Sequence, residues 1–360
     1  MLKILHIAPQ NYAGVPYDFY KMHNQCGDFS HLVTLHKNTL DFPEDICLNL
    51  PLPNFSLAKK WRRQKVANRE MQKRSEAIYF EPKNILEKIY FSISDFAKSS
   101  IIEEAIEKYN LNDFDIIHYD AGLDFFRNAS QAIKWKKQGK KIVCCYYGSD
   151  LRIRGLIKEL DEISDLNITS EFDHLALKKD IYYLFYPYNS SELPEKSETE
   201  TENENVTIIH SPTNRKYKGT ELIISVIEKI KKEKKIEFIL LENVSRSVVL
   251  EAKSRADICI DQVGGAMGGT GYGKAGLETL AMGIPTITNM SEEYSDWLPE
   301  NPFLVANNSI ELYSKLNELI NDRELRIKLG IKGKNWVEKY HGYKNVNDKL
   351  KELYRLNNII

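Results

Sequence analysis

The chain has 360 residues, of which 42% are hydrophobic and 28% charged, and its formal net charge is -1. This length is too great for one ordinary domain and fits two domains of roughly 150–190 residues. The balanced charge gives no reason to expect a nucleic-acid partner, and no stretch approaches the ~20 apolar residues that a membrane-spanning helix needs.

The cysteines and the first residues of the chain indicate a cytoplasmic protein. The five cysteines are scattered, odd in number and mostly set in apolar runs, which is typical of reduced thiols in a core. They show no spacing with histidine that suggests a metal site. The opening MLKILHIAPQ is typical of a strand and a loop, without the apolar stretch and cleavage site of a signal peptide. We therefore expect a soluble protein that meets a membrane only at its surface.

The first half of the chain alternates short apolar strands with amphipathic helical stretches. A loop containing Gly14 follows the first strand. The alternation predicts a parallel sheet covered by helices on both faces. The expected elements are strands at 2–8, 116–119, 142–147, 168–170 and 182–185, and a helix at 129–138.

An acidic segment separates the two halves. Residues 190–205, SSELPEKSETETENEN, contain six glutamates and no aromatic residue. Such a stretch cannot bury enough surface to fold alone. We interpret residues 191–205 as an exposed linker that follows a first domain at 1–190.

The second half repeats the strand–helix alternation. The expected elements are strands at 206–210, 236–241, 258–261 and 285–288, and helices at 219–232, 246–255, 274–282, 310–319, 323–340 and 344–356. The chain is therefore predicted to be α/β, with two Rossmann-like doubly wound domains that face a cleft. Ligands of such sheets bind beyond the carboxyl ends of the strands.

A glycine-rich loop leads into the helix that begins near residue 274. Residues 271–278 are GYGKAGLE, and the sequence continues as TLAMGIP. Glycines let the backbone approach a ligand, and the helix turns its free N–H groups and positive dipole end toward the loop. Glu278 lies about one turn into this helix, where its carboxylate can accept hydrogen bonds from a ribose diol. The segment predicts a cradle for a diphosphate or for sugar hydroxyl groups; the alternative is a flexible loop before a core helix.

A second candidate site follows the first strand of the second half. Residues 211–221, SPTNRKYKGTE, carry Arg215 and Lys218 just before a helix that starts near Gly219. Two fixed positive charges suit a pyrophosphate leaving group, whereas the alternative is a solvated basic turn. Because two anion-binding features converge on one domain, we expect this domain to hold the nucleotide.

Four polar residues follow strands of the first half. His118 and Asp120 come at the end of one strand, and Asp150 and Arg152 follow the next. Parallel sheets place functional groups at such ends, so His118 and Asp120 are candidate catalytic residues, and Asp150 and Arg152 candidate acceptor-side residues. Their structural alternatives are a core histidine, a helix cap and a surface charge.

Two further segments bear on metal binding and membrane binding. Asp113-Phe114-Asp115 precedes its strand, which is the wrong end for a metal site, so neither a metal nor a cofactor is predicted. Residues 59–74, KKWRRQKVANREMQKR, hold eight basic residues with Trp61, Val66 and Met71 interleaved. This segment (Lys59 to Arg74) is either a solvated loop or a contact with an anionic membrane surface.

Several segments resemble glycosyltransferase family 4. HSPTNRKYKGTE, ADICIDQ and GYGKAGLETLAMGIPTI are similar to its donor half, and most of all to a bacterial and archaeal branch. FDIIHYDAG and GKKIVCCYYGSDLR are similar to strand ends in the first half of that branch. The resemblance extends over about two thirds of the chain and is most specific from 208 to 288. It implies a GT-B fold and retaining, metal-independent transfer from a UDP- or GDP-linked sugar to a glycan, lipid-linked or other acceptor.

The resemblance also implies roles for individual residues. Arg215 and Lys218 would hold the diphosphate, and Glu278 the ribose. A domain at 206–335 would bind the donor, and helices at 336–360 would pack back on the first domain. The other residues expected around the nucleotide sugar are Gly14, Asn214, Glu242, Asp261, Thr270, Gly271, Tyr272, Gly273 and Lys274.

Three positions depart from the family pattern. Thr270 replaces the first glutamate of Glu-x7-Glu, Asp120 replaces the second histidine of His-x-His, and Tyr147 stands where relatives often carry histidine. Two alternatives therefore stay open: a sugar-nucleotide epimerase on the same fold, and a catalytically inactive nucleotide-sugar-binding subunit of a transferase complex. A dehydrogenase fits less well, since QNYAGV after the first strand is not G-x-G-x-x-G.

Overall fold

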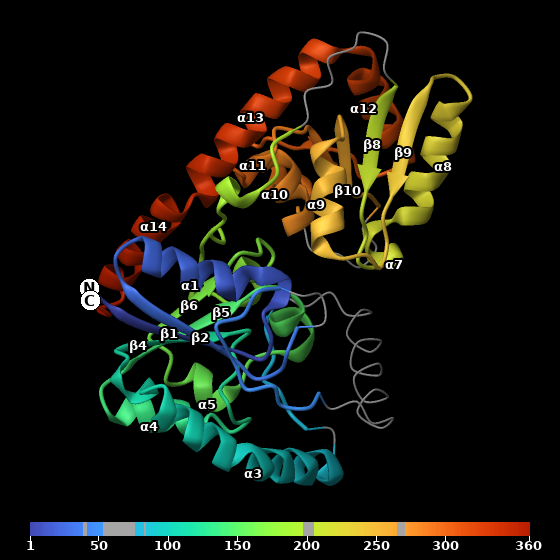
Figure 1. The fold of residues 1–360 in the computed structure, drawn as a ribbon. Coiled ribbons are helices and arrows are strands. Elements are labelled where there is room, and N and C mark those ends of the chain that lie inside the picture. The colour runs from blue at the N-terminus through green and yellow to red at the C-terminus, as the bar shows by residue number, and fades with distance from the viewer. Residues whose placement is uncertain (39–41, 53–75, 83, 197–204, 265–270) are drawn as a thin grey trace. The chain divides into compact units, whose positions relative to one another are not determined.

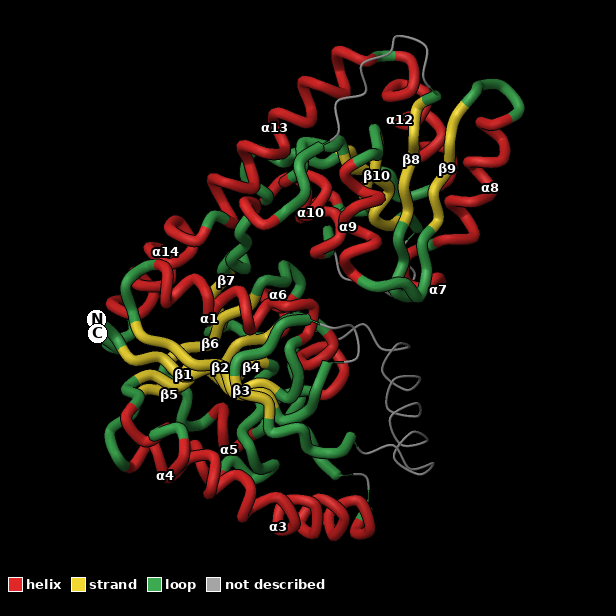
Figure 2. The backbone as a smooth tube through the Cα atoms, viewed as in Figure 1, coloured by secondary structure: helices red, strands yellow, loops and turns green. Residues whose placement is uncertain are grey.

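The computed structural model describes residues 1–38, 42–52, 76–82, 84–196, 205–264 and 271–360 (Figure 1). The chain forms two compact units. Met1–Pro187 and Tyr343–Ile360 make up the first unit, and Tyr188–Gly342 the second. Each unit is a parallel β-sheet packed between helices (Figure 2). The predicted α/β class with two Rossmann-like domains is confirmed.

The first unit contains a seven-stranded parallel sheet in the order β3-β2-β1-β4-β5-β6-β7. The order reverses between β1 and β4, and doubly wound sheets bind ligands beyond the strand ends at such a reversal. The strands are β1 (Lys3–Ala8), β2 (Phe29–Thr34), β3 (Ile46–Cys47), β4 (Ile116–Asp120), β5 (Lys141–Tyr146), β6 (Leu166–Thr169) and β7 (Ile181–Tyr183).

Helices cover both faces of this sheet (Figure 1). One face packs against α1 (Val15–Gln25) and α14 (Tyr343–Leu356), and the other against α3 (Ile85–Lys108), α4 (Ser130–Lys137) and α5 (Lys158–Asp161). A short helix, α6 (His174–Leu177), precedes β7. Because successive residues of a strand point to opposite faces, Leu5 and Ile7 join the core under α3 and α4, whereas His6 lies against α1.

The second unit contains a five-stranded parallel sheet in the order β12-β11-β10-β8-β9. Its order reverses between β8 and β10. The strands are β8 (Val206–His210), β9 (Ile236–Leu240), β10 (Ile258–Gln262), β11 (Thr286–Thr288) and β12 (Leu304–Val305). The side chains of Ile208, Ile258 and Ile260 form the centre of its larger core cluster.

The helices of the second unit flank this sheet. The core cluster on one face contains residues of α8 (Thr220–Lys231) and α12 (Ser309–Asn321), and a smaller cluster contains Leu250 of α9 (Arg246–Ser254). The remaining helices are α7 (Arg215–Lys218), α10 (Lys274–Ala281), α11 (Glu292–Trp297) and α13 (Arg323–His341).

Two expected boundaries differ from the structure. The expected division at residue 335 falls inside α13, which belongs to the second unit along its whole length, and the chain enters the first unit only at Tyr343. The expected linker begins with residues that belong to the second unit, including the 3-10 turn Ser190–Glu192. Its residues 197–204 lie outside the described part of the chain.

The structure adds elements that the sequence analysis did not predict: α1, α3, α5, α6, α7, α11, β2, β3 and β12. The segment around Gly14 was expected to be a loop, but α1 begins directly after it. Gly14 adopts the left-handed conformation with φ 74°, and Pro16 lies in the first helical turn, where its missing N–H costs nothing.

All five cysteines are free thiols. None of the helices in the described ranges combines the length and apolar character needed to cross a bilayer.

Candidate functional site

Three segments of the second unit meet at the carboxyl ends of β8 and β10. The ammonium group of Lys218 in α7 donates hydrogen bonds to Asp261 Oδ1 at 2.7 Å and to Gln262 Oε1 at 2.9 Å. The other carboxylate oxygen of Asp261 accepts the backbone N–H of Gly273 at 3.0 Å. One buried carboxylate therefore joins the basic turn, the end of β10 and the start of α10 at the point where the strand order reverses.

The basic turn reaches β10 because of the residues that begin and end it. Asn214 caps α7, since its side chain accepts the N–H of Tyr217 at 3.2 Å. Gly219 ends α7 with φ +67°, and a Cβ atom there would lie 1.8 Å from the carbonyl oxygen of Val263. Only glycine permits this close approach. The approach places the Lys218 carbonyl 3.2 Å from the N–H of Val263, which donates to it.

The charge of Asp261 is retained inside the unit. Burial opposes its ionisation, but the charge and hydrogen bond of Lys218, with the N–H of Gly273, outweigh burial and lower the pKa of the carboxyl group. Asp261 thus acts as a fixed anion that orients the Lys218 ammonium group and the first turn of α10. This turn is a helix N-terminus, whose positive dipole end favours an anionic ligand.

Arg215 lies at the start of α7 and is more open to solvent. Its guanidinium group pairs with Glu242 at 2.6 Å and with Glu221 at 2.8 Å. Its side chain is 40% exposed, and that of Glu221 is 77% exposed. Exposed ion pairs contribute little to stability, so these carboxylates can be exchanged for a more highly charged anion. Asn214 and Glu242, both expected at the site, thus hold the basic turn in place.

Glu278 is buried in an ion-pair network. Its Oε1 accepts from Arg246 at 2.9 Å, and its Oε2 accepts from Lys253 at 2.7 Å. The Lys253 ammonium group also donates to the carbonyl of Ala275 at 3.0 Å. Burial would raise the pKa of Glu278, but the charges of Lys253 and Arg246 outweigh burial and lower it. Both carboxylate oxygens are thus engaged within the unit, and the ribose contact expected of Glu278 stays a prediction.

The glycine-rich loop ends in an aromatic cluster. The ring of Tyr272 stacks on Phe303 at a centroid distance of 4.6 Å, and its hydroxyl lies 3.0 Å from His341 Nε2. Gly271 is fixed by its carbonyl, which accepts from Gln262 Nε2 at 2.7 Å. The Lys274 ammonium group lies 5.6 Å from the centre of the Tyr188 ring. These contacts anchor the loop where it enters α10; Thr270 lies outside the described residues.

His118 and Asp120 do not lie at an open strand end. His118 is fully buried, and its Nε2 lies 2.5 Å from the hydroxyl of Tyr354 in α14. Burial and the neighbouring His6 and His23 hold its pKa well below the usual range. Asp120 accepts from His6 Nδ1 at 3.0 Å and from the Tyr147 hydroxyl. His118 is therefore enclosed beneath α14 within the first unit, and the catalytic roles expected of His118 and Asp120 stay predictions.

The acceptor-side candidates organise loops of the first unit. The carboxylate of Asp150 accepts the N–H groups of Tyr147 at 2.8 Å and Gly148 at 2.9 Å, which closes the turn after β5. The guanidinium group of Arg152 pairs with both oxygens of Asp173 and with Glu171. An acceptor contact for Asp150 or Arg152 stays a prediction.

Sequence reasoning missed several residues of these networks. The sequence analysis included Gln262 only as the last residue of the ADICIDQ motif and did not name it as a site residue. In the structure, its side chain bridges Lys218 and Gly271. Arg246 and Lys253 lie seven residues apart on α9, which brings them to the same face of that helix. Their pairing with Glu278 depends on how α9 packs against α10, which the sequence alone does not give.

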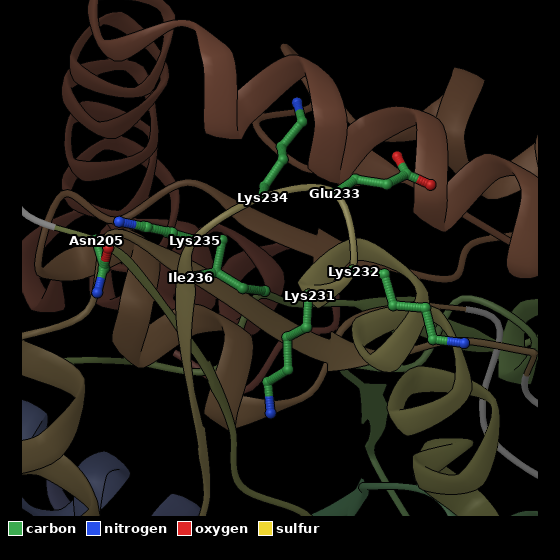
Figure 3. A pocket seen from close by; sticks show the side chains of 7 residues that line it. All are labelled: Asn205, Lys231, Lys232, Glu233, Lys234, Lys235 and Ile236. Carbon is green, nitrogen blue, oxygen red and sulfur yellow. The ribbon is translucent and has the colours of Figure 1, made fainter.

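A hollow elsewhere on the second unit is not part of this site. It is lined by Asn205 and residues 231–236, at the amino ends of β8 and β9 and so at the opposite edge of the sheet. Figure 3 shows that the side chains of its lysines splay in different directions. Lys231 pairs with Glu228, and Lys234 donates to Asn321. Because these lysines do not point toward one another, we assign no ligand to this turn.

A pH prediction arises from His210 at the end of β8. Its Nδ1 lies 2.8 Å from the Ile260 carbonyl and its Nε2 2.9 Å from the Thr220 hydroxyl. Burial lowers its pKa from 6.5 to about 4, although Asp261 and Glu242 oppose this and Lys218 reinforces it. In this pH range the unfolded chain binds a proton that the folded state does not bind.

The free energy of unfolding should therefore fall as the pH drops from 6.5 toward about 4, by at most about 1.4 kcal/mol per pH unit from this residue. Urea unfolding at a series of pH values, compared with His210→Gln, measures the slope. NMR titration gives the control: a His210 resonance that titrates near 6.5 would contradict the assignment.

Comparison with known proteins shows a shared fold. No protein-family model matches the chain, and no curated protein does. The catalytic domain of starch synthase IV from Arabidopsis thaliana, solved with ADP and acarbose, has 11% identity and a TM-score of 0.61 over 99% of each chain. HepE from Anabaena, solved with UDP and glucose, has 11% identity and a TM-score of 0.58 over 98% of this chain and 99% of that chain. Sucrose-phosphate synthase from Thermosynechococcus elongatus has 10% identity and a TM-score of 0.57 over 99% of each chain. The fold is thus that of the GT-B glycosyltransferases.

Proposed function

We propose that the chain is a glycosyltransferase whose second unit binds a nucleotide-diphosphate sugar. The observation that carries the proposal is the junction of Lys218, Asp261 and Gly273 where the strand order of the second sheet reverses. A diphosphate there would meet an oriented ammonium group and the N-terminus of α10. Starch synthase IV and HepE, which share the fold, were solved with ADP and UDP.

The chemistry of transfer follows from these charges. Cleavage of the bond between sugar and nucleotide leaves negative charge on the departing diphosphate. Lys218, held by Asp261, and Arg215, which pairs with the exposed Glu221 and the partly exposed Glu242, would stabilise that charge. We propose that the two cations act in place of a metal ion and that the enzyme retains the anomeric configuration. NMR of the freshly formed product tests the stereochemistry.

Nucleotide binding is the most direct test. Calorimetry with UDP, GDP and ADP should detect binding of at least one nucleotide, and EDTA should leave its affinity unchanged. The expected reason is that Lys218 and the α10 N-terminus provide the positive charge. Lys218→Met should weaken this binding, whereas Lys231→Met, on the opposite edge of the sheet, should not. Binding that EDTA abolishes would disprove the metal-independent site.

Turnover separates the transferase from its alternatives. Incubation with sugar nucleotides should release nucleoside diphosphate only when a glycan or lipid-linked acceptor is present. Conversion of the sugar without an acceptor would identify an epimerase. Nucleotide binding with no turnover, alone or with membrane lipid, would identify an inactive binding subunit.

The acceptor proposal includes contact with a membrane surface on the cytoplasmic side. It rests on the sequence of Lys59 to Arg74, which lies outside the described residues. Each basic residue near an anionic surface adds about 1 kcal/mol, which salt screens. Co-sedimentation with anionic vesicles should therefore exceed that with neutral vesicles and fall in high salt. Equal co-sedimentation with both lipids would refute the proposal.

A further inference from the structure

Three histidines distant in sequence meet inside the first unit. His6 on β1 and His118 on β4 are direct neighbours in the sheet register, and His23 lies on α1, which packs on the same face. Ring centroids are 4.5 Å apart for His6 and His118, 5.4 Å for His6 and His23, and 5.9 Å for His23 and His118. One nitrogen from each ring lies within 4.8 Å of the others.

Two of these imidazoles, His6 and His23, have ring nitrogens that the described residues leave without a hydrogen bond, whereas both nitrogens of His118 contact a neighbour. All three side chains are fully buried. Among the residues that the structure describes, His6 Nε2 and both nitrogens of His23 have no hydrogen-bond partner of normal geometry, although Asn347 lies near enough to influence the pKa of His23. A buried polar atom without a partner costs about 1–3 kcal/mol. A ligand shared by these neighbouring nitrogens would remove that cost.

We infer that His6, His23 and His118 form a structural binding site for a divalent transition-metal ion, with Zn²⁺ the preferred ion. Neutral imidazole is a favoured ligand of Zn²⁺, and three protein nitrogens with a fourth ligand complete its tetrahedral coordination. Two nitrogens bound to the same Zn²⁺ at about 2.0–2.1 Å in tetrahedral geometry lie roughly 3.4 Å apart, so the three nitrogens, now within 4.8 Å of one another, would have to move closer to share one ion. Sequence spacing did not show this site because its ligands come from two strands and a helix.

The surroundings of the cluster fit this role. Asp120 accepts from His6 Nδ1, which directs the free Nε2 into the cluster, as carboxylates commonly do for metal-binding histidines. Burial of a histidine favours its neutral form, which is the form that binds a metal ion, and His23 and His118 are both fully buried.

The charge of the ion can be balanced within the unit. Two candidates for a fourth ligand adjoin His118: the Tyr354 hydroxyl lies 2.5 Å from its Nε2, and the Cys145 thiol lies 3.4 Å from its Nδ1. Loss of a proton from either group to solvent, together with the charge of Asp120, offsets the two positive charges of the ion. Lys351, which acts on His23, pairs with Asp28 at 2.7 Å.

The test uses the full chain, because α14 covers the cluster and is the last helix. Protein purified without a histidine tag is unfolded with a chelator, refolded with ZnCl₂ or CoCl₂, and analysed for bound metal. We expect one equivalent of tightly bound metal and the intense visible absorption of tetrahedral Co²⁺. His23→Gln should weaken binding by roughly 100-fold or more. His31→Gln, a partly exposed histidine of the same unit that pairs with Asp45, is the matched control and should bind as the wild type does.

Two further variants keep the test decisive if His23→Gln fails to fold. His23→Cys retains a ligand atom and should add a sulfur-to-cobalt charge-transfer band. Asp120→Asn retains all three histidines and should weaken binding by about 10–100-fold. Wild-type protein that refolds without bound metal or tetrahedral Co²⁺ absorption would overturn the inference, and so would His23→Gln with wild-type affinity. Nucleotide binding by the second unit is a separate measurement, so failure of either proposal leaves the other standing.

Discussion

Replacement of Arg215 by alanine should lower kcat by roughly 100-fold or more, the scale of losing one preorganised donor to a developing charge, while the protein stays folded. Arg215 would face more negative charge in the transition state than in the bound donor, so its interaction strengthens as the bond breaks. Its side chain is 40% exposed and its partners are surface carboxylates, so the folded state tolerates its loss. Steady-state kinetics with the cognate donor and acceptor measure the effect, after circular dichroism has shown that the variant is folded.

Arg255 provides the matched control for this variant. It is an exposed arginine of the same unit, it pairs with Glu251 at 2.8 Å, and it follows α9, away from the basic turn. Arg255→Ala should retain full activity. Arg215→Ala is also a cleaner test than Lys218→Ala, because removal of Lys218 leaves the buried Asp261 without its cation. An Arg215→Ala enzyme that changes only in KM would assign Arg215 to ground-state binding.

Replacement of Glu278 by glutamine should lower the free energy of unfolding by about 3–5 kcal/mol, because it leaves a buried cation without its counter-ion. Lys253 is only 1% exposed and pairs with Glu278 at 2.7 Å. Arg246 can turn toward water, since 35% of its side chain is exposed. Lys253 has no such route and would retain only the Ala275 carbonyl. Urea denaturation, followed by tryptophan fluorescence, measures the loss.

A double-mutant cycle identifies the source of that loss. Lys253→Met removes the buried cation and replaces it with an apolar chain of similar length. Glu278→Gln combined with Lys253→Met should therefore recover much of the stability that Glu278→Gln loses alone. Should Glu278→Gln keep wild-type stability and instead raise KM for the donor, Glu278 would hold the ribose, as the family resemblance implies.

The sequence predicted the second unit better than the first for a physical reason. From β8 to α10, apart from the short α7, each strand is a short apolar run and each helix has a clear apolar spacing, so predicted and observed limits differ by at most one residue. In the first unit, α1 contains tyrosine, lysine, histidine and asparagine among its few apolar positions, and β3 has only two residues. Neither has enough periodicity to be recognised.

In the candidate site, too, the local motifs were predictable from the sequence, whereas the contacts between distant segments were not. The basic turn and the glycine-rich loop were found because each is a local motif, and the structure joins them through Asp261. The partners of Glu278 and the neighbours of His118 come from segments far along the chain, such as α9 and α14. Only the fold brings these together, so the sequence could not show that Glu278 is ion-paired or that His118 is enclosed.

The place of α14 in the first unit has a consequence for biosynthesis. Val346, Leu350 and Tyr354 of this helix are buried, and Tyr354 closes the space above His118. A ribosome makes Met1–Pro187 first, then all of Tyr188–Gly342, and only then the helix that completes the earlier unit. Until α14 is made, the nascent first unit therefore exposes an apolar face, whereas the second unit already contains all of its own residues. Of the two units, the one that is translated earlier is therefore completed later.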